Sequence, residues 1–355
     1  MIPVTKPFLP PKEEVIQYLD EIWERNWFTN DGPLVKMLED KLRRYLELEH
    51  LLFVSNGTIA LQIALKALKI EGEVITTPFS YVATTSSIVW ENCTPVFVDI
   101  DPETWNIDPV LIEKSITKKT TAILATHVFG NPCDVDAIQN IANSHGLKVI
   151  YDSAHAFGTT YKDKPILTYG DINAISFHAT KLYHTVEGGA IVTNDSHLAK
   201  RMMYMRNFGH DGPGRFNGVG INGKNSEVHA AVGLVNLNYV KEVLVKRKDN
   251  YDRYKSNLQG EMLTFQKIND VGTSNHSYMP VLFQNEKALN EILTELNNNN
   301  IFPRRYFYPS LDELDYVESG IMKVSQDISS RILCLPTFHD LTINEIDFIC
   351  SFFKK

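Results

Sequence analysis

A lysine and an aspartate follow two consecutive runs that are expected to form strands. Lys181 closes the segment 176–181, Ser-Phe-His-Ala-Thr-Lys, which follows the expected strand 172–176, and Asp152 comes after the apolar run 147–151. A lysine amine can form a Schiff base with the aldehyde of pyridoxal 5'-phosphate (PLP). A carboxylate can keep the pyridine nitrogen of that cofactor protonated, which makes the ring an electron sink. The pair therefore predicts PLP chemistry, with Lys181 and Asp152 as catalytic residues.

Each of these residues also has an ordinary explanation. Most lysines are solvated, and an aspartate at a strand end is often only a helix cap. The hydroxyl groups before Lys181 and the glycine pair at 188–189 suit a phosphate site better than a solvated face. His155 lies three residues after Asp152 and is expected to reach the phenolic oxygen of the cofactor, although a lone histidine is more often structural. We take His155 as the third catalytic candidate.

Other junctions between strands and helices add candidate cofactor contacts. Gly57 and Thr58 begin an expected helix, where free backbone N–H groups and the threonine hydroxyl can bind phosphate, although a plain cap is the commoner use. Ser176 ends another expected strand and can add a hydroxyl contact. Tyr81 follows a strand, so its ring can lie against a cofactor ring. The glycine-rich run 218–227 indicates either a flexible loop or a segment that crosses to a neighbouring subunit.

The composition is that of a soluble globular enzyme. The 355 residues are 43% hydrophobic and 22% charged, with a formal net charge of −8. This acidic balance, without a basic run, argues against a nucleic-acid partner. The sequence shows neither a signal-peptide pattern nor an apolar run that could span a membrane, so we expect a cytoplasmic protein without a membrane partner. The cysteine and aspartate spacings fit neither disulfides nor a ligand set, so no metal site is expected.

Short apolar strands alternate with helices from residue 51 to residue 193. This order predicts an α/β fold with a mostly parallel central sheet covered on both faces. A long helix from Glu227 to about Val245 follows, and the clearest later strands are 278–282 and 332–335. We therefore expect a large PLP-binding domain over residues 1–248 and a smaller C-terminal α+β domain over residues 249–355.

Taken together, these motifs resemble the DegT/DnrJ/StrS sugar aminotransferases, which are PLP-dependent transferases of fold type I. The matching segments run in family order over roughly the first two thirds of the chain and are 29–33, 55–61, 78–84, 97–109, 127–132, 152–158, 176–193 and 220–227. Each segment alone is weakly specific, whereas the combination is highly specific. Residues 2–11 and 176–189 are most similar to VioA-type members, which make dTDP-4-amino-4,6-dideoxyglucose from dTDP-4-keto-6-deoxyglucose.

The resemblance implies a role for each matching residue. Lys181 would carry the cofactor and move a proton, Asp152 would pair with the pyridine nitrogen, and His155 would lie by the phenolic oxygen. The remaining cofactor contacts would be Gly57, Thr58 and Ser176 at the phosphate and Tyr81 on the ring. A lysine at position 181 argues against the dehydratases of the family, in which a histidine replaces it.

The resemblance also implies residues beyond the cofactor. Asn222 would reach the phosphate in the neighbouring subunit, which makes the active unit a homodimer with shared active sites. Thr29, Lys224 and Tyr308 fall where the family approaches the nucleotide sugar. Lys224 and Tyr308 depart from the arginine and histidine that are frequent there, and Asn56 stands where serine is frequent.

The expected function is that of a nucleotide-sugar aminotransferase. It would move an amino group from L-glutamate to a dTDP-4-keto-6-deoxyhexose, for the synthesis of O-antigen lipopolysaccharide or another cell-surface polysaccharide. Two alternatives stay open. The same enzyme could act on a 3-keto or a UDP-linked ketosugar, or the chain could be a PLP-binding regulator without turnover.

Overall fold

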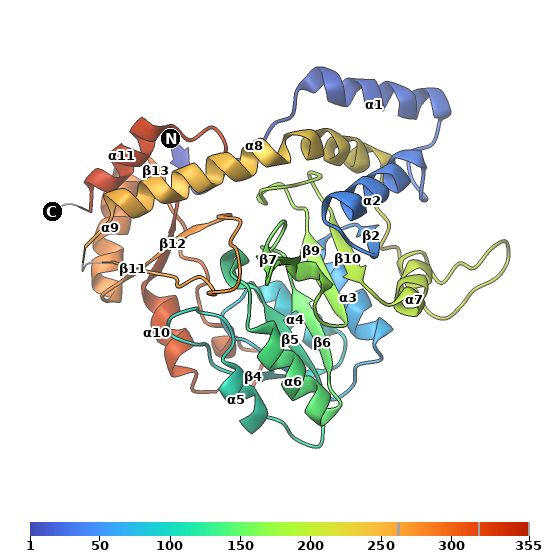
Figure 1. Cartoon of the computed structure of the whole chain (residues 1–355), viewed down its shortest axis with the longest axis horizontal. Coiled ribbons are helices and arrows are strands. Elements are labelled where there is room, and N and C mark those ends of the chain that lie inside the picture. The colour runs from blue at the N-terminus through green and yellow to red at the C-terminus, as the bar shows by residue number, and fades with distance from the viewer. Residues whose placement is uncertain (261–262, 319, 354–355) are drawn as a thin grey trace.

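The computed structural model describes residues 1–260, 263–318 and 320–353, and its centre is a seven-stranded sheet (Figure 1). The strand order is β2-β10-β9-β6-β5-β3-β4. β10 is antiparallel to both of its neighbours, and the other pairs are parallel. The expectation of a mostly parallel α/β sheet is confirmed. The strands are β2 (His50–Val54), β3 (Glu73–Thr76), β4 (Thr94–Phe97), β5 (Thr120–Thr126), β6 (Lys148–Asp152), β9 (Ile172–Ser176) and β10 (Gly189–Thr193).

Helices cover both faces of this sheet because successive strand side chains point to opposite sides and both sides are apolar. In β6, Val149 and Tyr151 belong to one buried cluster and Ile150 to the other. The first cluster is closed by α2 (Pro33–Tyr45), α5 (Pro109–Lys114), α6 (Val135–His145) and α8 (Glu227–Asn257). The second is closed by α3 (Gly57–Ala67), α4 (Val82–Trp90) and α7 (Ser196–Arg206).

The helix α8 is longer than expected, since it continues past Val245 to Asn257. The sequence after Val245 is rich in charged residues, so its buried face is not apparent from the sequence. The buried residues Val243, Arg247, Asn250 and Tyr254 are spaced by three and four residues and therefore lie on one side of the helix. In Figure 1 this helix runs across the molecule, from the side of α2 to the side of α11. The expected domain boundary between residues 248 and 249 therefore falls inside one continuous helix.

The C-terminal part of the chain forms a small three-stranded antiparallel sheet with helices packed on it. The sheet has the order β11-β12-β14, and the strand β1 (Ile2–Pro3) pairs with β13 (Ile301–Phe302) beside it. The first residues of the chain thus pack with its last third. The remaining elements here are β11 (Leu263–Phe265), β12 (Met279–Phe283), β14 (Ile332–Leu335), α9 (Glu286–Asn298), α10 (Lys323–Arg331) and α11 (Ile343–Ser351).

A shared core joins the two parts of the chain. Phe79, Trp105 and Phe129 from the first part pack in one buried cluster with Phe307 and Ile332 from the second. The helix α1 (Lys12–Arg25) lies outside this core and packs along α8 (Figure 1). A small hairpin, β7 (Thr160–Tyr161) with β8 (Lys164–Pro165), completes the strands.

Over the described ranges, no helix has both the length and the apolar character of a membrane span. The same ranges contain no group of three or more His, Cys, Asp or Glu side chains that could hold a metal ion.

Candidate active site

The carboxyl ends of the parallel strands meet at one edge of the sheet, where ligands bind in folds of this kind. The strand β6 ends there at Asp152 and β9 at Ser176, and the antiparallel β10 begins beside them at Gly189. A cavity of about 420 Å³ opens at this edge. The residues predicted for the cofactor that line it are Gly57, Thr58, Tyr81, Asp152, His155, Ser176 and Lys181.

The Asp152 carboxylate is buried and held by two hydrogen bonds. Thr84 Oγ1 donates to one carboxylate oxygen over 2.7 Å, and the backbone N–H of Ala154 donates to the other over 3.1 Å. A chain of hydroxyl groups continues from Thr84 through Ser80 to Thr126. Burial raises the pKa of Asp152, while these hydrogen bonds and the nearby charge of Lys181 act to lower it. The carboxylate therefore has a fixed orientation and little contact with solvent. Both properties favour a strong interaction with one cationic group.

The Lys181 amine lies in the same cavity, in a turn after β9. Its Nζ donates to the hydroxyl of Tyr278 over 3.4 Å. Burial lowers the pKa of Lys181 to about 8, with Asp152 raising it and Arg304 lowering it. An amine with this pKa is mostly an ammonium at pH 7, yet about a tenth of molecules carry the neutral form that a nucleophile and proton carrier needs, far more than for a solvated lysine.

His155 is a buried, neutral imidazole. Burial lowers its pKa well below the usual range, and the charge of Lys181 acts in the same direction. Nε2 lies 3.1 Å from the Tyr278 hydroxyl, whereas Nδ1 is buried without a hydrogen-bond partner among the described residues. The ring is parallel to that of Phe307, with centroids 5.7 Å apart and an interplanar angle of 3°. Packing therefore fixes the plane of the imidazole and leaves one nitrogen open.

The start of α3 forms a cradle beside Ser176. The side chain of Asn56 caps the helix by accepting from the backbone N–H of Ile59 over 2.8 Å. A Cβ at position 57 would lie 3.1 Å from the Cβ of Ser176, so a larger residue would push Ser176 away by a few tenths of an ångström and glycine suits this close approach. The first N–H groups of a helix have no acceptor within the helix, and they attract anions. The cradle suits a phosphate group.

Tyr81 lines the opposite part of the cavity, where its side chain is 53% exposed. Its ring centroid lies 6.2 Å from that of Tyr306, which belongs to the C-terminal part of the chain. An exposed aromatic ring at a cavity wall is available for stacking on a planar ligand.

Four residues predicted to bind substrate or a neighbouring cofactor lie outside this cavity. Thr29 is exposed, and its carbonyl accepts from the indole of Trp27 over 2.5 Å. Tyr308 is also exposed, and the guanidinium of Arg305 lies 3.6 Å above its ring. Lys224 Nζ donates to the side-chain oxygen of Asn222 over 2.8 Å in the loop before α8. A single chain thus brings together the residues predicted for the cofactor, apart from Asn222. It does not bring the three residues predicted for the sugar into the same cavity.

Several residues in and beside the cavity were not predicted from the sequence. Arg304 and Tyr306 line it, and Tyr278 contacts both Lys181 and His155. All three come from the C-terminal part of the chain, and no local motif marks them. Thr84 was inside a segment that resembles the family, but only its contact with Asp152 shows what its hydroxyl does.

These features fit PLP. One cavity is lined or adjoined by four groups. They are a buried carboxylate, an imidazole nitrogen without a hydrogen-bond partner among the described residues, a lysine amine of lowered pKa, and a glycine cradle at a helix start. They match, in turn, the pyridine nitrogen, phenolic oxygen, aldehyde and phosphate of the cofactor.

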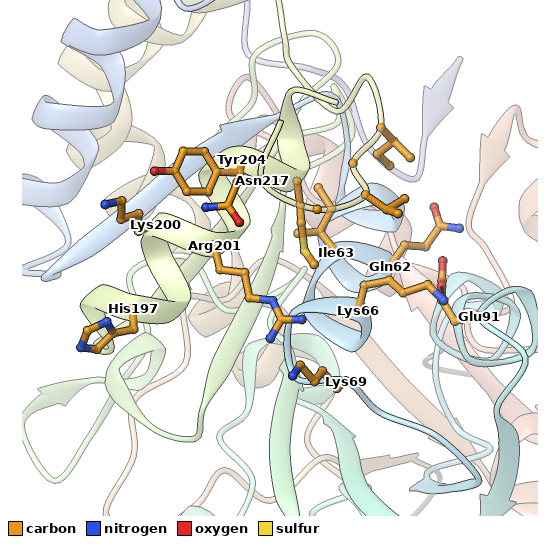
Figure 2. Close-up of a pocket in the computed structure, with 15 residues that line it drawn as sticks. Gln62, Ile63, Lys66, Lys69, Glu91, His197, Lys200, Arg201, Tyr204 and Asn217 are labelled. Carbon is orange, nitrogen blue, oxygen red and sulfur yellow. Dashed lines mark ion pairs between the residues drawn. The ribbon is translucent and has the colours of Figure 1, made fainter. Parts of the chain in front are cut away.

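A larger cavity of about 840 Å³ lies elsewhere, between α3, α7 and the loop 217–221 (Figure 2). Figure 2 shows Arg201 of α7 and Lys69, just beyond α3, extending toward each other, and Lys66 pairs with Glu91 over 3.0 Å. The residues that line it include none of those predicted for the cofactor. Chemistry rather than size therefore identifies the candidate active site.

Comparison with known proteins identifies the family of the chain. The sequence pattern of the DegT/DnrJ/EryC1/StrS aminotransferase family matches residues 11–354. A dTDP-4-amino-4,6-dideoxy-D-glucose transaminase of Shigella dysenteriae is 42% identical, over 99% of this chain and 98% of that protein. A GDP-perosamine synthase of Escherichia coli O157:H7 is 34% identical, over 99% and 97%.

Solved structures agree in fold. The structure of DesI in the presence of its TDP-sugar product has a TM-score of 0.93 and 31% identity, over 99% of this chain and 91% of that one. The PLP form of the putative sugar aminotransferase Spr1654 from Streptococcus pneumoniae has a TM-score of 0.89 and 26% identity, over 99% and 97%. The chain, with its lysine, aspartate and histidine gathered in one cavity, belongs to the DegT/DnrJ/EryC1/StrS aminotransferase family.

Proposed function

We propose that this protein uses PLP to transfer an amino group from L-glutamate to a dTDP-4-keto-6-deoxyhexose, giving dTDP-4-amino-4,6-dideoxyglucose. The main observation in support is that Lys181, Asp152 and His155 line the same cavity. Two relatives named dTDP-4-amino-4,6-dideoxy-D-glucose transaminase, at 42% and 41% identity, support the sugar. A product of this kind suits the assembly of O-antigen or another cell-surface polysaccharide, and a relative from Bacillus subtilis is named a spore coat polysaccharide biosynthesis protein.

Asp152 and the helix cradle would hold the cofactor in place. The carboxylate of Asp152, fixed by Thr84 and the backbone of Ala154, is the group that would bind a protonated pyridine nitrogen. The N–H groups at Gly57 and Thr58 and the hydroxyl of Ser176 would take the phosphate. When bound, PLP supplies an aldehyde that accepts the amino group and a ring that takes up electrons.

Lys181 would perform the proton transfers. Its amine must be neutral to accept a proton from the donor carbon and charged to return one to the sugar carbon. A pKa of about 8, set mainly by burial, makes both states accessible near neutral pH. Besides burial, Asp152 acts to raise this pKa and Arg304 to lower it.

The test is a comparison of wild type with Lys181→Ala. The wild-type protein is expected to be yellow, with a visible absorbance band that borohydride bleaches and that glutamate converts. Lys181→Ala should lose the conversion while still able to bind PLP noncovalently. Lys248→Ala, on the exposed side of α8, is the matched control and should behave as wild type. Full turnover by Lys181→Ala would refute the proposal, and absence of turnover in wild type would favour a PLP-binding regulator.

The sugar is tested with a small panel. We expect the largest kcat/KM with dTDP-4-keto-6-deoxyglucose when compared with a 3-keto isomer and with UDP- and GDP-linked ketosugars. The GDP-linked compound belongs in the panel because relatives at 30–34% identity are named GDP-perosamine synthases. A larger kcat/KM with any of these would assign a different sugar to the same site.

We further propose that the active unit is a homodimer. The loop from Phe208 to Ile221 extends away from the body beyond α7 (Figure 1). It exposes apolar side chains, with Phe216 63% and Val219 88% accessible. Exposed apolar groups concentrated on one loop favour a partner surface. Because Asn222, at the base of this loop, lies outside the cavity of its own chain, a contribution to the cavity of the neighbour accounts for both features.

The two parts of the chain would have different roles in this function. We propose residues 1–248 as the cofactor-binding part and residues 249–355 as a smaller part that closes the cavity. Arg304 and Tyr306 support this division because they line the cavity from the second part. Residues 354 and 355 lie outside the described structure.

A further inference from the structure

Tyr278 connects two titratable side chains that line the cavity, Lys181 and His155. It lies just before β12, and its hydroxyl is 3.4 Å from Lys181 Nζ and 3.1 Å from His155 Nε2. Its ring packs 5.3 Å from that of Phe129 and 5.8 Å from that of Tyr306, measured between centroids. The hydroxyl group therefore has a defined position between an amine and an imidazole.

The direction of these hydrogen bonds follows from the chemistry of the groups. A lysine ammonium has only donors, so the Tyr278 oxygen accepts from Lys181. Burial raises the pKa of Tyr278 well above its usual value, so the hydroxyl keeps its one proton. His155 Nε2, 3.1 Å away, is the acceptor within reach of that proton when the neutral imidazole has its lone pair on Nε2.

Donation from Tyr278 to Nε2 selects one tautomer of His155. A neutral imidazole that accepts at Nε2 carries its proton on Nδ1. Nδ1 is the nitrogen without a hydrogen-bond partner in the described part of the chain. The series from Lys181 through Tyr278 to His155 thus ends in an open N–H donor.

We propose that Tyr278 is a positioning residue, which orients the Lys181 amine and fixes His155 in the tautomer that carries its proton on Nδ1. The inference rests on the proposed function, in which that N–H would meet the phenolic oxygen of PLP. It also gives the C-terminal part of the chain a defined role, because strand β12 positions the hydroxyl. The competing explanation is that Tyr278 is simply an aromatic packing residue whose hydroxyl has no role.

Tyr278→Phe separates these two explanations because it keeps the ring and removes only the hydroxyl. Tyr254→Phe is the matched control, since it removes a buried hydroxyl that donates to the Pro336 carbonyl over 2.9 Å in the core of the C-terminal part. Thermal unfolding of both variants measures any general loss of stability. A hydroxyl that only contributes to packing should give the two variants similar behaviour in every other measurement.

The first measurement is the tautomer itself, by NMR of the full-length protein labelled with ¹⁵N-histidine and freed of cofactor. The signals of His155 are assigned by their absence in His155→Gln. We expect a protonated Nδ1 in wild type and in Tyr254→Phe. In Tyr278→Phe a substantial share of the proton should move to Nε2. An unchanged His155 spectrum in Tyr278→Phe would overturn the proposal.

The second measurement is the pH dependence of PLP capture by cofactor-free protein, followed through the visible band. Without the oxygen that accepts from its ammonium form, Lys181 should lose protons more easily, so the midpoint should move down by about one pH unit. Conversion by glutamate in the loaded enzyme should also slow by about tenfold, with KM changed less than kcat. A midpoint equal to that of Tyr254→Phe would overturn the role at Lys181.

These outcomes are distinct from a failure of the proposed function. A wild-type protein without a borohydride-sensitive band would refute PLP chemistry as a whole. A wild type with that band, beside a Tyr278→Phe protein that matches it in tautomer and midpoint, would refute only the positioning role.

Discussion

Asp152 is held by neutral donors from Thr84 and Ala154, so its negative charge remains available to a bound cation. Asp152→Asn removes that charge with little change in shape. We expect the fold to persist and the rate of conversion by glutamate to fall by about a hundredfold or more, as when one electrostatic partner of a reacting group is lost. Asp136→Asn, at an exposed ion pair with Lys162, is the control. A rate within a few-fold of wild type in Asp152→Asn would contradict the assigned role.

The Lys181 amine should make cofactor capture depend on pH. Only the neutral amine attacks an aldehyde, and the pKa of Lys181 is lowered to about 8, mainly by burial. The capture rate of cofactor-free protein should therefore rise about tenfold per pH unit below this pKa and level off above it. Arg304 also lowers this pKa, so Arg304→Gln should move the midpoint to higher pH. A midpoint that stays in place would show that Arg304 does not act on the amine.

At the level of helices and strands, the start of α2 is capped by a side chain from α8. The buried carboxylate of Glu227 accepts from the backbone N–H groups of Leu34 and Val35, each over 2.9 Å. Gly32 leaves room for it, since a Cβ there would lie 2.5 Å from the Glu227 carboxyl carbon. This contact anchors the loop that carries Thr29 to the start of the longest helix.

Glu227→Ala should therefore destabilise the protein. Two buried N–H groups would lose their acceptor, and the charge at the helix start would be lost, at a cost of about 2–4 kcal/mol. Chemical denaturation should show this loss, and Glu242→Ala, at an exposed position of the same helix, should change the unfolding free energy by less than about 0.5 kcal/mol. Equal stability of the two variants would mean that the cap contributes nothing.

For the whole molecule, the proposed shared site makes a quantitative prediction. If each cavity combines Lys181 of one chain with Asn222 of the other, a mixed dimer of Lys181→Ala and Asn222→Ala chains has one site with both lesions and one intact site. Random exchange makes half of the dimers mixed, so about a quarter of wild-type activity should return from two weakly active parents. Subunit exchange is verified independently with differently tagged chains.

Two outcomes would contradict the shared site. Asn222→Ala could by itself keep wild-type PLP affinity and rate, or exchange could be complete without recovery of activity. A mixture of Lys181→Ala with wild type is the control, because its activity should only follow the number of intact Lys181 sites.

The sequence by itself determined a mostly parallel sheet, where its main strands end, and most of the residues that the structure places around one cavity. Apolar runs that alternate with helices predict buried parallel strands, and parallel strands end at one edge, so Asp152 and Ser176 are expected at the same edge, where the pairing of β6 with β9 brings them close. Gly57 and Lys181 follow from junctions next to these strands, where backbone and residue type are set locally. The fold class and the family could be predicted for the same reason. Both depend on short segments that can be recognised from residues adjacent in the sequence.

Only the tertiary structure decided how the rest of the chain completes the site. Tyr278 and Arg304 carry no local signal, because their roles depend on where the small sheet packs against the large one. The length of α8 was also hidden, since its buried face past Val245 includes Arg247 and Asn250, which are polar residues in the sequence. Local patterns determine which face of an element is apolar and where it ends. Which distant side chains meet in one cavity depends on packing between elements, and packing is a property of the whole fold.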